Sequence, residues 1–136
     1  MRVLFWYMDR FAFKPAVKNL EKAETISNGG EIEKAIVAFV HGEEKDKENT
    51  QKAETKLIKN IKWLAGKWDC KTVVLHSFAH LGESKCDPDC LKALFDRAEQ
   101  RLTDVGYEVL QTPYGYFLDI EVSAPGRSLA RVYKEF

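Results

Sequence analysis

Apolar positions along the chain follow two periods, one typical of strands and one typical of helices. Five apolar or alternating segments predict strands, at residues 2–7, 35–40, 71–76, 107–110 and 116–122. Turn-forming residues are concentrated at residues 25–30, so we expect the chain to reverse between the first two strands. In the last strand, Leu118, Ile120 and Val122 share one face and acidic side chains the other, which predicts a half-exposed strand.

Two longer segments have the helical period. Between residues 50 and 68 the apolar side chains recur every three or four positions, at Ala53, Leu57, Ile61, Leu64 and Trp68. The second helix has clear end signals: Asp87 can cap free backbone N–H groups, Pro88 suits the first helical position, and Gly106 suits the left-handed residue that ends a helix. Its expected core face is Leu91, Leu94, Phe95, Ala98, Leu102 and Val105.

The order of these elements predicts an α/β fold, a mixed β-sheet with two main amphipathic helices packed on it. The chain has 136 residues, 45% of them hydrophobic and 12% aromatic, which suffices for one packed core but not for two. We therefore expect a single domain over residues 1–136. The sequence leaves open whether this domain is part of a longer protein or free-standing.

Charge and composition limit the kinds of partner. The 21 lysines and arginines equal the 21 aspartates and glutamates, so no overall positive field draws the chain onto RNA or an anionic membrane. Any RNA contact must then be local. No apolar stretch approaches the roughly 20 residues that span a bilayer, and no signal-peptide pattern is present, which predicts a soluble, cytoplasmic protein. The three cysteines do not make a disulfide framework and are expected to be free thiols.

Two short segments combine residues that suit a ligand site. Residues 77–82 place His80 directly after a predicted strand, at the edge where α/β proteins collect ligands. Residues 112–117 combine a rigid proline, a glycine that lets the backbone approach a ligand, and three aromatic residues that can stack on a base. Each segment also has a structural interpretation, a solvated histidine and a turn entering a strand. Taken alone, each is more often structural than functional.

Taken together, the two segments resemble a known family. The pattern Phe-Ala-His-Leu at 78–81, Pro-Tyr-Gly-Tyr-Phe at 113–117 and Ser-Ala-Pro-Gly-Arg-Ser-Leu-Ala at 123–130 is similar to the N-terminal editing domain of archaeal threonyl-tRNA synthetases. Asp9, the apolar strand 36–40 and Glu43-Glu44 also match, more loosely. The resemblance implies a fold like that of D-aminoacyl-tRNA deacylases, a homodimer, and removal of serine wrongly attached to threonine tRNA. The partners it implies are the seryl acceptor end of that tRNA and a synthetase body, in cis or in trans.

The resemblance also implies which residues form the editing pocket, between the Ala-His loop and the Pro-aromatic-Gly turn. The catalytic positions would be Ala79, His80, Gly115 and Tyr116. The substrate-binding positions would be Gly42, Glu43, Phe78, Tyr114, Phe117 and Tyr7. A pocket that admits serine and excludes the methyl group of threonine is needed because one methyl contributes only about 1–3 kcal/mol of discrimination.

Four positions depart from the family pattern. At residues 116–117, Tyr-Phe replaces the more usual pair of tyrosines. Leu118 stands where family members usually carry a lysine, Arg131 stands where many have a glutamate, and Arg127 replaces a histidine. Because an aminoacyl ester is already labile, a positioned water and backbone N–H donors aimed at the oxyanion can suffice, with the 2′-hydroxyl of the substrate assisting. We expect His80 to position the substrate on this view. The alternatives are an inactive tRNA-binding or assembly module and a D-aminoacyl-tRNA deacylase.

Other features of the sequence are interpreted as structural. Cys70, Cys86 and Cys90 lack the spacing of a closed zinc site, so we expect no metal, and Cys90 is assigned to the core. No phosphate-binding or dinucleotide glycine pattern implies a cofactor. His41 and His76 end apolar strands and are expected to face solvent or a backbone partner. The mixed charges of residues 43–59 are expected on the surface.

Overall fold

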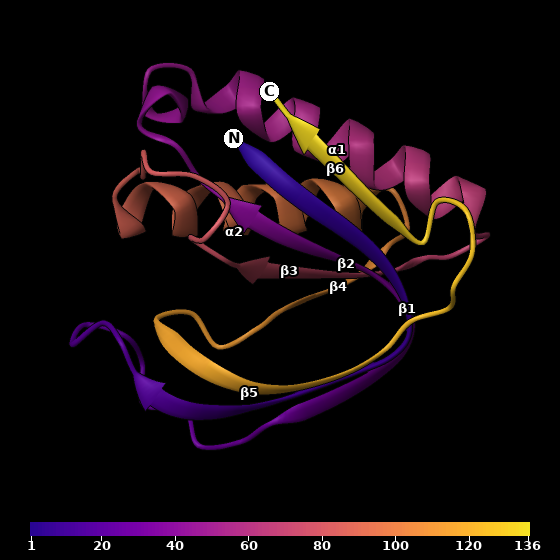
Figure 1. Cartoon of the computed structure of the whole chain (residues 1–136). Coiled ribbons are helices and arrows are strands. Elements are labelled where there is room, and N and C mark those ends of the chain that lie inside the picture. The colour runs from indigo at the N-terminus through magenta and orange to yellow at the C-terminus, as the bar shows by residue number, and fades with distance from the viewer.

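A computed structural model describes residues 1–136 and consists of one twisted sheet with two helices (Figure 1). The elements in chain order are β1 (Arg2–Lys18), β2 (Gly30–His41), the short 3-10 helix η1 (Glu44–Lys47), α1 (Thr50–Lys67), β3 (Thr72–Ser77), α2 (Pro88–Asp104), β4 (Glu108–Gln111), β5 (Tyr116–Ser123) and β6 (Arg131–Glu135). The strands lie in the order β4-β3-β2-β1-β5, and β6 also pairs with β1. The pairs β2–β3 and β3–β4 are parallel and those of β1 antiparallel. The predicted mixed α/β sheet with two helices is confirmed.

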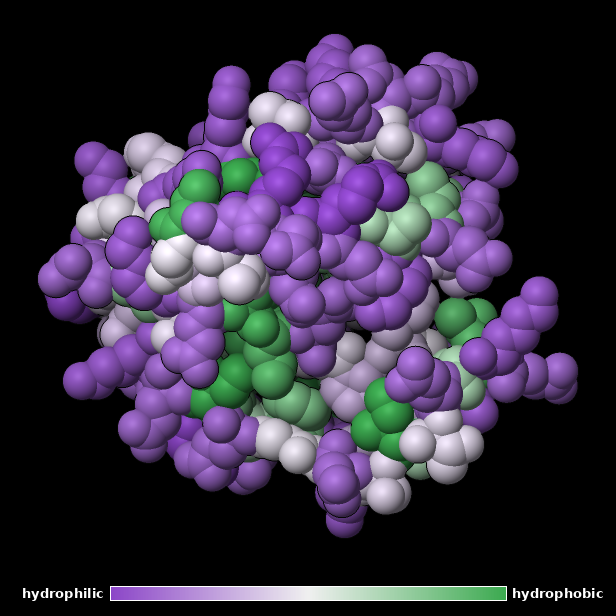
Figure 2. All heavy atoms as spheres, turned by 180° about the vertical axis from the view of Figure 1, so that it is seen from behind, coloured by the Kyte–Doolittle hydropathy of each residue, from purple (hydrophilic) through white to green (hydrophobic).

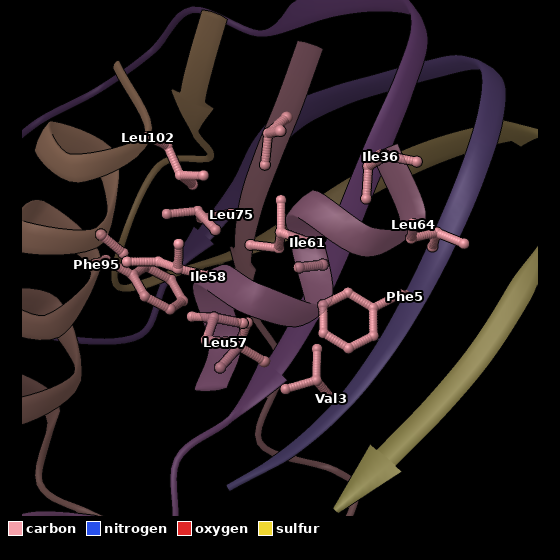
Figure 3. Close-up of a cluster of buried hydrophobic side chains, with 14 of the residues drawn as sticks. Val3, Phe5, Ile36, Leu57, Ile58, Ile61, Leu64, Leu75, Phe95 and Leu102 are labelled. Carbon is pink, nitrogen blue, oxygen red and sulfur yellow. The ribbon is translucent and has the colours of Figure 1, made fainter. Parts of the chain in front are cut away.

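Both helices pack on the same face of the sheet. A cluster of 21 buried residues combines the apolar stripes of both helices with side chains of β1, β2 and β3. Figure 3 shows Leu57, Ile61 and Leu64 of α1 pointing from the helix towards the strands that carry Phe5 and Ile36. This cluster is the main source of hydrophobic stabilisation, since burying each large apolar side chain contributes about 1.5–3 kcal/mol. Neither helix is long and apolar enough to cross a membrane.

Strand β1 belongs to two cores. Val3, Phe5 and Tyr7 lie in the cluster beneath the helices, whereas Phe11 and Phe13 lie in a second cluster of 7 buried residues on the other face of the sheet. The first half of β1 pairs with β6 and its second half with β5. In Figure 1 the second half bends away from the helices together with β5 and the start of β2. The bend turns β5 towards the carboxyl ends of β3 and β4.

The helix boundaries follow the local signals in the sequence. The Asn49 side chain accepts a hydrogen bond from the backbone N–H of Lys52 (3.1 Å), and Asp87 accepts one from Cys90 (2.9 Å). Each cap satisfies a donor at the first turn that has no partner within the helix. After α2, Gly106 has the predicted left-handed conformation, with φ of 96°. The predictions of helix position are confirmed.

Several predictions from the sequence differ from the structure. The strand expected at residues 2–7 extends to Lys18, and β6 was not predicted at all. Val105, assigned to the core face of α2, is 51% exposed because it follows the last helical turn. Cys90 is only partly buried. Three acidic side chains of the segment expected on the surface are buried, namely Glu43, Asp46 and Glu54.

Glu54 joins the two helices through a buried carboxylate. Its Oε1 accepts from Arg97 Nε (2.6 Å) and its Oε2 from Arg101 Nη1 (2.7 Å), both on α2. The Glu54 side chain is 6% exposed, whereas those of Arg97 and Arg101 are 47% and 43% exposed. The carboxylate therefore depends on the two arginines for hydrogen bonds that water cannot supply, while the arginines keep some contact with solvent.

Replacing Glu54 with alanine should lower the free energy of unfolding by about 1–2 kcal/mol, because two charge-assisted hydrogen bonds are lost but the arginines can rehydrate. Urea denaturation followed by circular dichroism measures the change. Glu48→Ala is the matched control, since Glu48 is exposed and its side chain has no partner in the chain; it should change stability by less than about 0.5 kcal/mol. Equal losses in both variants would show that the Glu54 contacts do not stabilise the helix pair.

Candidate functional site

A cavity of about 660 Å³ opens beyond the carboxyl ends of β2 and β3. It lies between the loop that follows β3, the start of α2, and the turn that leads into β5. It is lined by Asn19, Leu20, Gly42, His76, Ser77, Phe78, Ala79, His80, Lys85, Cys86, Pro88, Leu91, Thr112, Pro113, Tyr114, Gly115, Tyr116, Phe117, Leu118 and Ile120. The fold thus brings together the two segments singled out in the sequence, at the edge of the sheet where α/β proteins bind ligands.

The loop that carries Ala79 and His80 is held by the end of β2. The N–H of Phe78 donates to Val40 O (2.9 Å), and His41 bonds the loop twice. Its Nδ1 accepts from the N–H of Leu81 (3.1 Å), so its Nε2 donates to Ser84 O (2.6 Å). His41 is fully buried. The backbone partner expected for this histidine is therefore confirmed, and its two hydrogen bonds fix the loop.

The opposite wall is the turn at residues 112–115, which is held by the connection between β1 and β2. Gly115 has φ of 83°, and its carbonyl accepts from the N–H groups of Asn19 (2.7 Å) and Leu20 (3.1 Å). A side chain at Gly115 would be strained by this φ and would collide with Leu20 and Ala23. The Tyr116 hydroxyl donates to Glu24 O at 2.8 Å.

His76 forms the inner end of the cavity. It is 8% exposed, its Nδ1 lies 2.9 Å from Thr112 Oγ1, and its ring packs edge-on against Phe39 at 4.8 Å. Burial lowers the pKa of His76 to about 4, so the ring is neutral at physiological pH. The expectation that His76 faces solvent or a backbone partner is wrong, because its ring packs among Phe39, Phe78 and Phe11 and Thr112 supplies a side-chain partner.

The residues that line the cavity include unpaired backbone donors and few charged groups. The N–H groups of Ala79, His80 and Gly115 make no hydrogen bond within the chain. His80 is exposed, with its ring edge-on to Phe78 at 4.9 Å. No aspartate or glutamate lines the cavity, and Lys85 is its one lysine. The Tyr114 hydroxyl donates to Pro88 O (2.7 Å), and burial raises the pKa of Tyr114. The site can therefore hold a polar, uncharged group such as an ester without a side-chain carboxylate.

Two residues expected in the pocket from the sequence do not line the cavity. Tyr7 lies in the core beneath the helices, stacked on Trp68 with ring centroids 4.0 Å apart. Glu43 faces the chain start, where its Oε1 accepts from the amino group of Met1 (2.9 Å). Burial alone would raise the pKa of Glu43, but this hydrogen bond and the charges of Met1, Lys45 and Arg2 outweigh it, so the pKa is lowered. The other eight expected site residues line the cavity.

The sequence did not indicate several lining residues. Asn19 and Leu20 reach the cavity only because Gly115 binds their backbone, and His76 and Thr112 meet only when β3 and β4 pair. Leu118, which replaces a lysine in the family resemblance, does line the cavity. Arg127 and Arg131 do not; they lie over the rings of Trp68 (5.0 Å) and Trp6 (5.5 Å).

Known proteins resemble this chain in fold and in sequence. The structure of a c-Myc DNA Unwinding Element Binding Protein superposes with a TM-score of 0.70 and covers 100% of this chain and 99% of its own, at 13% identity. A likeness at this identity concerns the fold alone, and it agrees with the fold class predicted from the sequence.

Curated archaeal proteins match the chain at the sequence level. The chain is 27% identical over 135 residues to the threonine–tRNA ligase of Thermococcus kodakarensis and 28% identical over 133 residues to that of Methanopyrus kandleri. Each alignment covers 97% of this chain but only 22% and 21% of the relative. The ligase of Hyperthermus butylicus is 29% identical over 143 residues, 100% of this chain and 23% of that protein. The chain therefore spans about a fifth of the length of these relatives.

The family match covers every element described above, from β1 to β6. Residues 1–136 match the family described as the Archaea-specific editing domain of threonyl-tRNA synthetase. The resemblance seen in the Phe-Ala-His-Leu and Pro-Tyr-Gly-Tyr-Phe segments is thus confirmed, and the chain belongs to the family of archaeal threonyl-tRNA synthetase editing domains.

Proposed function

We propose that the chain removes serine from mischarged threonine tRNA by hydrolysing the seryl ester in the cavity beyond β2 and β3. The observation that carries this proposal is the group of three unpaired N–H donors, from Ala79, His80 and Gly115, on two walls of one cavity. Family membership supports proofreading in general. The choice of serine, the catalytic groups and the assembly described below are parts of the proposal.

The terminal adenosine would bind among the aromatic side chains of the cavity. Phe117 lines the cavity and is 52% exposed, which leaves a ring face accessible to a base. Phe78, Tyr114 and Tyr116 provide the further apolar walls. The seryl ester would then lie between the Ala79-His80 loop and the Gly115 turn, where the small side chain of Ala79 and the glycine let the backbone approach the ester.

Hydrolysis in this arrangement needs a water and donors for the developing oxyanion. A water oriented by the ribose 2′-hydroxyl attacks the ester carbonyl, and the backbone N–H groups stabilise the negative charge on the carbonyl oxygen. The ester C–O bond then breaks, the 3′-oxygen of the ribose takes a proton, and serine leaves. Backbone donors are already fixed by the loop contacts, so they need no reorganisation during the reaction.

Side-chain acid or base catalysis has little support in this cavity. No carboxylate lines it, and His76 is a weak base because its pKa is about 4. His80 is exposed and has no partner that would orient its ring as a base. We therefore assign His80 to substrate positioning, which leaves the 2′-hydroxyl and the backbone as the main catalytic aids.

Selection of serine over threonine would come from steric exclusion. Ala79, Gly115 and Gly42 border the cavity with little or no side chain, and Gly42 lies directly against Cys86 and Leu91. Packed backbone cannot retreat to admit another methyl group, and closely packed walls penalise added volume by about 1–3 kcal/mol. Threonine would thus be rejected by the same surfaces that hold serine.

The remaining partners follow from this role. The chain spans about a fifth of the archaeal ligases it matches, so a synthetase body would act with it in cis or in trans. The site would work in the cytoplasm, where tRNA is charged, and would need no cofactor. We also propose that the chain forms a homodimer and constitutes one domain.

An inactive tRNA-binding module is the second candidate. It is favoured by Leu118, since an apolar side chain lines the cavity where the family resemblance implies a lysine. Such a module would bind tRNA without turnover. A D-aminoacyl-tRNA deacylase would instead hydrolyse many D-aminoacyl esters with little regard for the side chain. The closely packed backbone at Ala79, Gly115 and Gly42 argues against so broad a substrate range.

Single-turnover deacylation of seryl- and threonyl-tRNA, both on threonine tRNA and with a chelator present, tests the proposed activity. We expect serine to be released at least about tenfold faster than threonine, because one methyl group accounts for roughly 10–200-fold discrimination. Release of neither amino acid would favour the binding module. Comparable release from D-aminoacyl esters would favour the deacylase.

His80→Ala should slow seryl-tRNA hydrolysis by about tenfold or less, since the proposed oxyanion donors are backbone groups that the substitution keeps. The same single-turnover assay measures the rate, with tRNA affinity determined in parallel. A matched comparison is Gly115→Ala, which strains the backbone at φ of 83° and should cost more activity than His80→Ala. Complete loss of hydrolysis in His80→Ala with unchanged tRNA binding would contradict a positioning role.

The dimer proposal rests on the face of the sheet opposite the helices. On that face Ile120 and Val122 of β5 are 43% and 41% exposed, and they pair with Phe13 and Phe11 of the second cluster. Trp6 borders the same cluster and its buried Nε1 has no hydrogen-bond partner. In the rear view, apolar side chains gather mostly on the lower half of the molecule, where β5 lies (Figure 2). Such a surface suits a second copy of the chain.

Val122→Glu should convert the dimer to a monomer, because a charge would be buried against apolar side chains. Light scattering after gel filtration measures the mass. Val105→Glu is the control, since Val105 is 51% exposed and lies away from this face. An unchanged mass for Val122→Glu, or a monomeric wild-type chain, would place the interface elsewhere or exclude it.

A further inference from the structure

The outer surface of α1 carries a stripe of lysines in a chain with no net charge. Lys52, Lys56, Lys59 and Lys67 are all exposed and follow the helical period on the side opposite the buried face. Trp63, which is 41% exposed, continues the same line. We call this line, Lys52-Lys56-Lys59-Trp63-Lys67, the α1 stripe. It extends over roughly 22 Å at the rise of an α-helix.

None of the stripe lysines is neutralised within the chain. No ion pair involves Lys52, Lys56, Lys59 or Lys67. The one acidic residue of α1, Glu54, is buried and held by Arg97 and Arg101, which adds further positive charge beside the helix. Like charges at i,i+4 and i,i+3 destabilise a helix, so Lys52-Lys56 and Lys56-Lys59 give the fold no benefit. A bound polyanion would remove this repulsion.

The surface around these lysines is suited to a phosphate backbone. A shallow depression of about 410 Å³ lies over the first half of α1, lined by Asn49, Gln51, Lys52, Thr55, Lys56 and Lys59, none of them apolar. Successive lysines on one helix face are about 5–6 Å apart, similar to the spacing of neighbouring phosphates along an RNA strand. At the far end, Lys134 of β6 lies over the ring of Trp63 (5.4 Å).

The N-terminal end of α1, where the stripe starts, is linked to the editing cavity through the start of α2. The Lys47 Nζ–Asp87 Oδ2 ion pair (3.0 Å) ties η1 to the start of α2, and Pro88 and Leu91 of α2 line the cavity. Both helices begin at the same end of the molecule in Figure 1, and α1 runs from there to the opposite end. The rear view shows a predominantly hydrophilic surface over its upper part (Figure 2). Lys85 is exposed and supplies a further cation at the cavity itself.

We propose that the α1 stripe binds the phosphate backbone of the tRNA acceptor arm while the aminoacylated end occupies the cavity. This inference rests on the proposed function for its choice of RNA and for the direction in which the arm leaves the cavity. It also explains how a chain with no overall positive field can hold a polyanion, since the positive charge is concentrated on one helix. Phosphate contacts of this kind give affinity and orientation without sequence specificity.

The test compares two triple charge reversals in the full chain. Lys52→Glu/Lys56→Glu/Lys59→Glu removes the first half of the stripe. Lys14→Glu/Lys34→Glu/Lys71→Glu changes the net charge equally at exposed positions outside the stripe. Binding of uncharged, fluorescently labelled threonine tRNA is measured by anisotropy at several salt concentrations. The stripe variant should bind at least about tenfold more weakly, and the slope of log affinity against log salt should fall by about three. The control variant should keep the wild-type slope.

A second variant guards against an effect of misfolding. Lys52→Gln/Lys56→Gln/Lys59→Gln removes the charges with residues that are also good helix formers and should reproduce the weaker slope. Unchanged tRNA affinity and slope in both stripe variants overturn the proposal; this is also the outcome expected if the stripe contacts an acidic protein surface such as the synthetase body. Seryl ester on a short single-stranded acceptor end should be hydrolysed equally by wild type and stripe variant. If wild type binds tRNA through the stripe but hydrolyses neither substrate, the stripe proposal stands and the editing proposal fails.

Discussion

Strand β1 is the element on which the rest of the structure depends, because this strand of 17 residues pairs with three others. On one side it pairs with β2; on the other, β6 takes its first half and β5 its second. The bend between these halves lets one strand supply Val3 and Phe5 to the core under the helices and Phe11 and Phe13 to the second cluster. Without that bend β5 would continue a flat sheet, and the turn before it would not face the end of β3.

The loops around the cavity are held by contacts to these strands more than by the side chains that line it. His41 and Val40, at the end of β2, hold the loop with Ala79 and His80, while the connection that follows β1 holds Gly115. Both walls are therefore fixed by contacts to the central hairpin, and the donors they present belong to the backbone. In the proposed mechanism such a site would tolerate a side-chain replacement such as Leu118, provided that both loops keep their conformation.

The sequence predicted the features that local signals decide. Asp87, Pro88 and Gly106 define the ends of α2 because capping and left-handed backbone are properties of a few neighbouring residues. Strand β6 was missed because Arg131–Glu135 alternates weakly and becomes a strand only by pairing with β1. The two halves of the site were indicated by their motifs, whereas Asn19 and His76 were not, since their positions depend on contacts between distant segments. Tyr7 looked like a pocket residue from its place in the chain, but its side chain lies in the core.

The distribution of charge suits two tasks that the proposed recognition of an aminoacylated tRNA would impose. The ester is uncharged, and carboxylates near the developing oxyanion would oppose hydrolysis, so a cavity without acidic residues suits it. The RNA backbone is strongly charged, and lysines around the ester would bind phosphates in its place. In the proposed function, cations kept on α1 would attract the polyanion while the ester would meet backbone donors in the cavity. The net charge of zero does not show that the lysines of α1 and the cavity without acidic residues lie in different parts of the molecule.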